Sequence, residues 1–373
     1  MAQKHLLNKK PDKSHDASGA HKRARTIGVV LVGFGEPQDC SKKAIRKFGK
    51  SVLLDKNASK GNRLLWWLKV RFRMLRNVTK ENVQAFQNIW PQGNFPEQEA
   101  LSALCDPLSK LLSNEDNVMV CAATLFGSTT LRSAFSRLKD MNCNKVLVFP
   151  LFPQSSFSIA QTLASKLKDA KKRTRLDCLL SIVSNYYNNE TYTHAVAAAI
   201  EHAGFNEQAG DKLLLAYRSI PLFDIEQGDT YELQTGATSL AVAGELNLSR
   251  NSWTMAYFAT PFDSREHLDP YVRDVVERWA RYCTGRMFIV CPGFANESIR
   301  TQFYVNKVLR HKFNAIRLQA KGQGEGSVLK GAAHARALAE PEFVYVPALG
   351  KTRAHLKVLT QVLMPYITEE KEQ

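Results

Sequence analysis

The sequence predicts an α/β protein with two similar Rossmann-like domains, each holding a four-stranded parallel sheet flanked by helices. Three observations support this fold class. Short runs that are apolar on both faces recur along the chain, as buried parallel strands require. Stretches with the apolar spacing of amphipathic helices alternate with these runs, which favours parallel sheets covered by helices. The length of 373 residues corresponds to about two domains.

The predicted strands form two groups of four along the chain. They lie at residues 27–32, 118–122, 145–150, 179–183, 212–217, 253–257, 287–290 and 343–346. Helical spacing between them predicts helices at residues 131–141, 158–171, 191–202, 235–246, 270–282 and 300–313. Each group of strands predicts one sheet, and each sheet one domain.

These groups place the domain boundaries. We expect an N-terminal domain over residues 26–176 and a C-terminal domain over residues 177–352. A last helix at residues 353–366 is expected to pack back on the N-terminal domain. A glycine- and alanine-rich stretch at about 319–340 predicts a flexible insertion, to which no function is assigned.

Most of the positive charge lies in two segments. The formal net charge is +16, of which residues 1–25 carry +5 and residues 41–80 carry +12, so the rest of the chain sums to −1. Residues 1–25 are polar without hydrophobic periodicity, and we expect a disordered basic tail. Their acid-poor composition also fits a mitochondrial targeting segment. The predicted location is therefore the mitochondrion, with a cytoplasmic, membrane-associated protein as the alternative.

Composition excludes several classes of protein. A hydrophobic fraction of 44% with 23% charged residues is typical of a globular chain and not of a disordered one. No apolar run approaches the roughly 18–20 residues that a membrane-spanning helix needs. The seven cysteines form no Cys-x-x-Cys pair, which argues against a zinc or disulfide framework and indicates a reducing compartment. The turn from Gly33 to Gly35 lacks the third glycine of a dinucleotide-binding motif.

Seven short motifs, in order along the chain, resemble ferrochelatases, the enzymes that insert ferrous iron into protoporphyrin. They are Gly28-Val29-Val30-Leu31-Val32 with Gly35 and Pro37, Arg63-Leu64-Leu65-Trp66-Trp67, residues 149–156, Tyr217 with Ile220-Pro221, Gly228-Asp229 with Tyr231, residues 290–294 and residues 345–349. The motif at residues 63–67 and the pair Ile89-Trp90 are most similar to the gamma-proteobacterial type.

The resemblance implies the chelatase fold with a porphyrin cleft between the two domains. It implies Fe²⁺ and protoporphyrin or haem as ligands, and no resident cofactor. Some members hold an iron–sulfur cluster through C-terminal cysteines, but no cysteine follows Cys291 here, so no cluster is expected. Ligands of such sheets bind beyond the carboxyl ends of the strands. The residues expected there to bind porphyrin are Gly35, Glu36, Pro37, Phe126, Pro153, Gln154, Ser156, Tyr217, Ile220, Pro221, Pro292 and Phe294.

Two arginines occupy the positions at which the resemblance implies catalytic side chains. The family's histidine after a strand corresponds to Arg218, and its glutamate on the facing loop corresponds to Arg300. Arginine neither accepts a proton at neutral pH nor offers a lone pair to a metal. At about 5 Å and an effective dielectric near 20, each guanidinium would oppose an approaching Fe²⁺ ion by roughly 6–7 kcal/mol. We therefore assign no metal ligand and expect both arginines to be non-catalytic.

The altered positions leave two interpretations of function. The first is a ferrochelatase-family protein of haem biosynthesis that is catalytically impaired, and that binds porphyrin or haem or regulates an active chelatase paralogue. The second is an active ferrochelatase with a non-standard base and a metal path built from loop acids, namely Glu36, Glu97, Asp224, Glu226 and Asp263. Arg218 is accordingly either a loop residue that replaced a lost histidine or, with Arg300, an anion site that grips carboxylates.

The second basic segment predicts an amphipathic helix. Apolar side chains at positions 64, 65, 68, 72 and 75 follow helical spacing among basic residues. A basic amphipathic helix with tryptophan is typical of interfacial membrane binding, so we name Trp66, Trp67, Arg71 and Arg73 the membrane lip. A helix packed on the domain with a solvated basic face is the alternative. We do not expect nucleic acid as a partner, because no recognition module is visible.

Overall fold

The structure, a computed structural model, describes residues 26–57, 63–91, 95–113, 117–259, 265–283, 285–324 and 343–368, without the side chains of residues 63, 73 and 320–324. The predicted tail at residues 1–25 lies outside the described residues, and so does most of the predicted insertion. Helix α11 (Arg310–Gly324) contains the first part of that insertion. Residues 319–324, at the start of the predicted insertion, are therefore helical.

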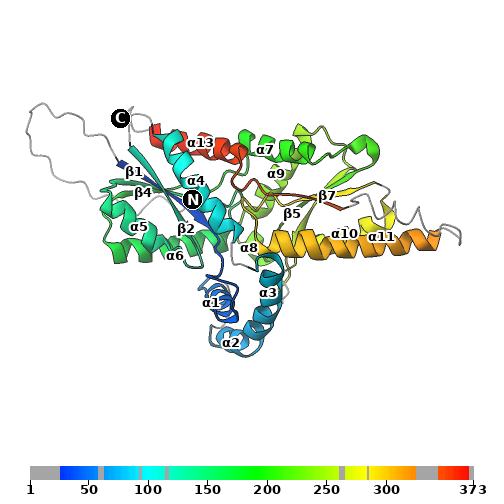
Figure 1. Ribbon diagram of the computed structural model, residues 1–373, viewed down its shortest axis with the longest axis horizontal. Coiled ribbons are helices and arrows are strands. Elements are labelled where there is room, and N and C mark those ends of the chain that lie inside the picture. The colour runs from blue at the N-terminus through cyan, green and yellow to red at the C-terminus, as the bar shows by residue number, and fades with distance from the viewer. Residues whose placement is uncertain are drawn as a thin grey trace, which may run out of the picture.

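The N-terminal sheet consists of four parallel strands in the order β2-β1-β3-β4. They are β1 (Thr26–Gly33), β2 (Asn117–Thr124), β3 (Lys145–Pro150) and β4 (Leu179–Ile182). The central strands β1 and β3 are buried along nearly their whole length, since helices lie on both faces of the sheet (Figure 1). Such strands need apolar residues on both faces, which explains their sequence pattern.

The C-terminal sheet repeats this arrangement, with parallel strands in the order β6-β5-β7-β8. They are β5 (Lys212–Arg218), β6 (Trp253–Phe258), β7 (Met287–Val290) and β8 (Phe343–Val346). Strands β5, β6, β7 and β8 occupy the positions that β1, β2, β3 and β4 occupy in the first sheet. The predicted fold class, two similar four-stranded parallel α/β domains, is confirmed.

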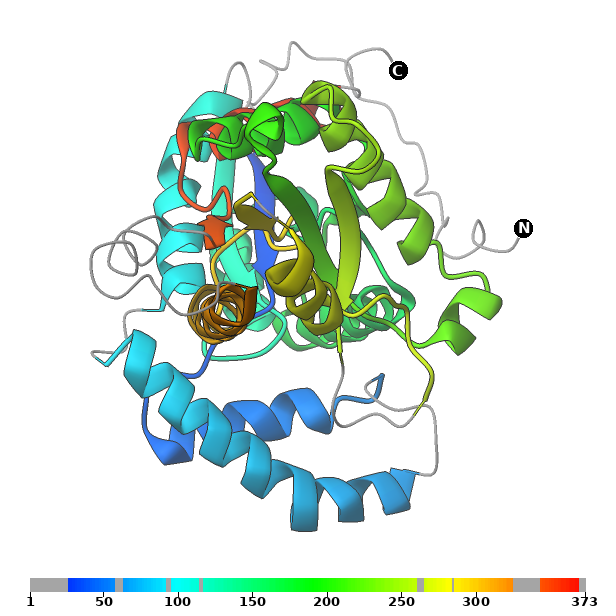
Figure 2. The same ribbon diagram turned by 90° about the vertical axis from the view of Figure 1, so that its right-hand side faces the viewer.

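The helices lie around the two sheets (Figures 1 and 2). They are α1 (Lys42–Leu53), α2 (Arg63–Lys69), α3 (Leu75–Ile89), α4 (Pro96–Leu112), α5 (Leu131–Asp140), α6 (Phe157–Thr174), α7 (Glu190–His202), α8 (Leu222–Glu226), α9 (Tyr231–Glu245), α10 (Val272–Tyr282), α11 and α13 (Arg353–Thr368). A single 3₁₀ turn, η2 (Glu207–Ala209), precedes β5, and two segments, η1 (Val70–Met74) and η3 (Arg300–Leu309), are π-helical. Helices α1, α2 and α3 lie together, outside the layers that cover the sheets (Figure 2).

Side-chain caps fix where two of the predicted helices begin. The Thr130 hydroxyl accepts the N–H of Ser133 at 3.2 Å before α5. The Asn189 amide oxygen accepts the N–H of Tyr192 at 3.0 Å before α7. Such caps satisfy amide groups that the first turn of a helix leaves unpaired. The helices predicted from residues 131 and 191 therefore start at polar residues suited to this role.

The N-terminal sheet continues past the boundary that the sequence predicts. Strand β4 pairs in parallel with β3, with Leu179 opposite Lys145. Strand β4, which follows the predicted boundary between residues 176 and 177, therefore belongs to the first sheet. Helix α13, at the C-terminal end of the described chain, packs against α4 and α7. The ammonium of Lys145 also donates to the carbonyl oxygen of Tyr366 in α13 at 2.8 Å.

One apolar core runs through both domains. It contains Val29 and Leu31 of β1 together with Leu213 and Leu215 of β5, and none of these side chains is exposed. Side chains of α4, α7 and α13 belong to the same cluster. Close-packed interiors deform little, so the shared core holds the two sheets in a fixed relation.

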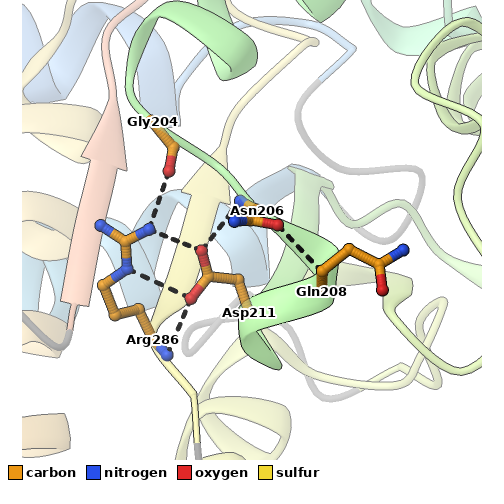
Figure 3. A network of polar contacts seen from close by, with 5 residues as sticks. All are labelled: Gly204, Asn206, Gln208, Asp211 and Arg286. Atoms are coloured by element: carbon orange, nitrogen blue, oxygen red, sulfur yellow. Dashed lines mark hydrogen bonds and ion pairs between the residues drawn. The ribbon is translucent and has the colours of Figure 1, made fainter.

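An ion pair between a buried carboxylate and a half-buried arginine connects segments at the amino-terminal edge of the second sheet (Figure 3). The carboxylate of Asp211, before β5, has 1% of its surface exposed and accepts from Arg286 Nη2 at 2.7 Å. Arg286, before β7, also donates its backbone N–H to Asp211 at 3.1 Å and its guanidinium to the carbonyl of Gly204 at 2.7 Å. The N–H of Asn206 donates to the same carboxylate at 2.9 Å. This network ties the turn after α7 to the starts of β5 and β7.

Candidate functional site

Loops at the carboxyl ends of the two sheets meet at one junction between the domains. The guanidinium carbon of Arg218, at the end of β5, lies 5.5 Å from the ring centre of Phe34 in the loop after β1. The loop after β3 is joined to α9 by a hydrogen bond of 2.8 Å from the N–H of Ser155 to Gln234 Oε1. Ligands of open parallel sheets bind at this edge.

Arg218 lies where β5 leaves the core. Tyr217 before it is fully buried, and its hydroxyl lies 2.9 Å from Ser239 Oγ on α9. Side chains alternate along a strand, so Arg218 points the other way and keeps an exposed surface. The surrounding protein nevertheless lowers the pKa of Arg218 by desolvation, which Tyr231 opposes. Arg218 is therefore enclosed by protein on several sides and still reachable from solvent.

Arg300 begins the π-helical segment η3 and is half-buried. Its guanidinium carbon lies 5.4 Å from the ring centre of Phe258 and 5.7 Å from that of Tyr304. Desolvation lowers the pKa of Arg300, and the positive charge of Arg218 lowers it further. The two arginines that the sequence places on separate loops are therefore brought within range of mutual repulsion. π-Helical segments often occur at functional sites.

Neither guanidinium has an acidic partner among the described residues. The ion pairs of this part of the chain do not involve Arg218 or Arg300. Both side chains contact aromatic rings instead. Within the described residues, the positive charge of the two arginines is therefore not paired with a carboxylate.

Two carboxyl groups interlock on the N-terminal side of the junction. Glu97, near the start of α4, accepts the N–H groups of Phe34 at 2.7 Å and Gly35 at 2.6 Å. Glu36 in turn accepts the N–H groups of Glu97 at 3.4 Å and Gln98 at 3.1 Å. Burial, and next the charge of Glu97, raise the pKa of Glu36 to about 8, against these backbone hydrogen bonds. Burial also raises the pKa of Glu97. The pair therefore retains a proton near neutral pH and fastens the loop after β1 to α4.

The loops after β1 and β2 pack backbone against backbone. Gly35 has a φ of +107°, and a Cβ at this position would lie 1.5 Å from the carbonyl oxygen of Phe126. Gly127 has a φ of +109°, and a Cβ there would lie 2.5 Å from the carbonyl oxygen of Glu36. Only glycine fits both positions, so close approach of the two loops explains both residues.

Most residues that the sequence assigns to porphyrin are buried in the structure, and Phe294 alone among the twelve is half-buried. Gln154 donates to Thr238 Oγ1 at 2.9 Å, and the carbonyl of Pro292 accepts the hydroxyl of Tyr192 at 2.5 Å. The first of these bonds joins the loop after β3 to α9 of the other domain, and the second fastens the loop after β7 to α7. The others lie in the same loops or directly beneath them: Gly35, Glu36, Pro37, Phe126, Pro153, Ser156, Tyr217, Ile220 and Pro221.

Aromatic rings lie against both arginines of the junction. Phe34, Phe294 and Tyr304 are half-buried and lie on loops or segments that hold or contact the two arginines. Sequence reasoning did not assign Phe34 or Tyr304 to the site. Phe34 directly follows β1, and Tyr304 lies one helical turn beyond Arg300. Their positions in the sequence could therefore have identified both as candidate site residues.

The membrane lip divides into an inward and an outward part. Trp66 is half-buried and donates its indole N–H to the carbonyl of Leu53 at 2.8 Å. Trp67 is 42% exposed and Phe72 is 70% exposed. Arg71 lies 5.9 Å from the ring centre of Trp67, whereas the Arg73 side chain is outside the described part of the chain. Within the described residues, no helix has the length and apolar character to cross a bilayer.

Several curated bacterial ferrochelatases are similar to the chain over most of its length. A ferrochelatase of Nitrosococcus oceani is 26% identical over 348 residues, covering 93% of this chain and 88% of its own length. That of Methylococcus capsulatus is 26% identical over 347 residues, covering 93% and 98%. That of Teredinibacter turnerae is 27% identical over 349 residues, covering 92% and 88%. These relatives are bacterial and give no support to the predicted mitochondrial location.

Comparison with solved structures supports the chelatase fold. SirB from Bacillus subtilis with Fe³⁺ superposes with a TM-score of 0.55 at 10% identity, covering 93% of this chain and 98% of SirB. The sirohydrochlorin chelatase SirB in complex with cobalt superposes with a TM-score of 0.50. A family model described as Ferrochelatase matches residues 26–320. With the strand order, the paired loops and these matches together, the chain belongs to the ferrochelatase family.

Proposed function

We propose that this chain binds a porphyrin or haem at the junction between its domains and does not insert metal by a histidine–glutamate route. Membership of the family supports a tetrapyrrole ligand. The observation that carries the second part is the presence of Arg218 and Arg300 where the resemblance implies a base and a metal ligand. Both are protonated at neutral pH and have no lone pair to offer.

Metallation of a porphyrin requires two kinds of functional group at the ring centre. A base must receive the two pyrrole N–H protons, and donor atoms must deliver the metal and release it. The described residues contain no group of three or more His, Cys, Asp or Glu side chains placed to hold a metal ion. Fe²⁺ as substrate would also meet the positive charges of Arg218 and Arg300, which no described carboxylate pairs with and each of which would oppose it by several kcal/mol at short range.

Loop acids do not supply an evident replacement path. Glu36 and Glu97 accept backbone N–H groups and so act as fasteners of the loop after β1. Asp224 is buried in α8, while Glu226 in the same helix is exposed. Asp263 lies outside the described residues. These placements favour the impaired chelatase over an active one with a non-standard metal path.

A metallation assay tests the proposal directly. Protein would be incubated anaerobically with protoporphyrin and Fe²⁺, or with Zn²⁺, and the product followed by its absorbance. We expect no metalloporphyrin above the protein-free rate, but saturable quenching of porphyrin fluorescence with a Kd of about 1 μM or below, typical of specific sites. The Methylococcus capsulatus ferrochelatase serves as the positive control. Turnover comparable to that control would refute the proposal, and so would absence of porphyrin binding.

Peripheral membrane contact is a second proposal, carried by the outward part of the membrane lip. Trp67 and Phe72 expose large apolar surfaces beside the basic side chains of Lys69 and Arg71. Such a combination suits insertion among lipid headgroups that carry negative charge. A membrane contact would also suit a protein that handles poorly water-soluble porphyrins.

Vesicle binding is expected to depend on the exposed rings. Replacing Trp67 and Phe72 together by Ser should weaken binding to vesicles of anionic lipid at least about tenfold, because each buried ring contributes roughly 1.5–3 kcal/mol. Co-sedimentation at low and high salt measures this. Leu233→Ser, on α9 and 73% exposed, is the matched control. Equal binding of the double variant and wild type would exclude the membrane lip.

A further inference from the structure

We propose that Arg218 and Arg300 together form a carboxylate-binding site that recognises the acidic side chains of the bound tetrapyrrole. The inference rests on the proposed function and adds the part of the ligand that these two residues hold. Arg218 and Arg300, at the positions where the resemblance implies a base and a metal ligand, would then bind an anion instead.

The first supporting observation is the charge of the two arginines. The positive charge of Arg218 lowers the pKa of Arg300, so the two side chains lie near enough to interact. No carboxylate among the described residues pairs with either of them. Arrangements that destabilise the folded protein, such as two like charges held close together, occur often at sites where a bound ligand removes the unfavourable interaction. An anion bound between the arginines would remove the repulsion and satisfy their donors.

The second observation is orientation. Arg218 lies against Phe34, and Arg300 lies against Phe258 and Tyr304. Contact with a ring restrains a planar guanidinium while leaving its N–H edges available. Those edges match the two oxygens of a carboxylate and can donate two parallel hydrogen bonds. The arginines are thus arranged for carboxylates before a ligand arrives.

The third observation distinguishes a porphyrin acid from a free inorganic anion. Phe34 and Tyr304, which contact the arginines, and Phe294, which packs against Phe258, are half-buried and so keep some accessible surface. A small anion would use the guanidinium groups and leave these rings in water. A flat apolar ring system bearing carboxylates would use both. The junction therefore favours a tetrapyrrole with free acid groups.

Comparing a porphyrin with its ester tests this inference. Protoporphyrin IX and its dimethyl ester would be titrated into wild-type protein in the same non-ionic detergent, with porphyrin fluorescence as the readout. We expect the free acid to bind about 10–100-fold more tightly than the ester, as charge-assisted hydrogen bonds imply. Arg218→Gln and Arg300→Gln should each weaken the free acid about tenfold and leave the ester unchanged.

The control variant is Arg273→Gln, an exposed arginine of α10 that pairs with Asp274. It should change neither titration. Arg218→Lys should lie between Gln and wild type, because lysine keeps the charge but loses the two-pronged donor. If wild type and both Gln variants bind acid and ester alike, the carboxylate site is excluded while the proposed function stands. If wild type binds neither form, the proposed function fails as well.

Thermal unfolding without ligand separates recognition from a structural role. Removing one of two like charges should leave the melting temperature of Arg218→Gln equal to or above that of wild type. A residue needed for packing would lower it, and that result would overturn the inference. Protoporphyrin should raise the melting temperature of wild type more than that of the Gln variant, whereas equal protection by inorganic phosphate would indicate a non-selective anion site and also overturn it.

Discussion

Between pH 5 and pH 8 the folded protein is expected to lose about 3–5 kcal/mol of unfolding free energy through the carboxyl group of Glu36. Its pKa is about 8 in the folded protein, raised first by burial and then by Glu97, against an ordinary value of 4.5. Below pH 4.5 the group is protonated in both states. As the pH rises, the unfolded chain ionises freely while the folded chain keeps its proton. Stability is therefore highest in acid and declines until the pH passes the folded pKa.

The Glu36→Gln variant isolates this effect. Glutamine keeps the shape and cannot ionise, so its unfolding free energy should lack this decline and exceed that of wild type at pH 8. Urea unfolding at pH 5, 6, 7 and 8 measures the difference. Glu99→Gln, in the same helix as Glu97 but exposed, is the matched control and should follow wild type. Parallel pH curves for Glu36→Gln and wild type would show that Glu36 is not protonated at neutral pH.

Asp211→Ala is expected to destabilise the protein by about 2 kcal/mol, since it removes a buried acceptor of several hydrogen bonds while the Arg286 side chain, 35% exposed, can still be solvated. The carboxylate accepts hydrogen bonds from the Arg286 side chain, the Arg286 backbone and the Asn206 backbone (Figure 3). Its removal leaves these donors unsatisfied at the starts of β5 and β7. Chemical unfolding of the full chain gives the measured value.

The exposed pair of Arg273 and Asp274 provides the comparison for Asp211. Its side chains are 66% and 55% exposed, so Asp274→Ala should cost less than about 1 kcal/mol. Asp211→Asn should fall between the two, because the amide keeps one acceptor. An Asp211→Ala variant as stable as Asp274→Ala would mean that water replaces the carboxylate without cost.

The fold could be predicted because its strands carry a strong local signal. Strand β1 is apolar at nearly every position, and the structure buries it on both faces. Strand β4 shows the limit of that reasoning. Its end residues Leu179 and Ile182 are exposed at the edge of the sheet, and the strand follows the predicted domain boundary although it pairs with β3. A boundary depends on which neighbour a strand pairs with, which is a tertiary property.

The site was predictable only in part for a similar reason. Strand ends placed Arg218 and Arg300 at loops of the second domain, and the structure brings them together. The hydrogen bonds between Glu36 and the start of α4 span 61 and 62 positions of sequence, and no local pattern encodes them. Burial of residues such as Gln154 likewise follows from contacts between domains. The sequence therefore predicted which loops form the site, but not which of their side chains are buried and which are accessible.

The packing of α13 on α4 has a consequence for how the protein is made. The apolar face of α4 belongs to the first domain, but the side chains of Leu359 and Leu363 that pack in its core cluster belong to the last described helix. About 170 residues separate β4 from α13, which at ribosomal rates of about 5–20 residues per second is roughly 10–30 s of synthesis. During that interval α13 is not yet present to pack on α4 of the nascent first domain. We therefore expect the apolar residues of α4 that α13 covers in the folded protein to stay accessible until α13 has been synthesised.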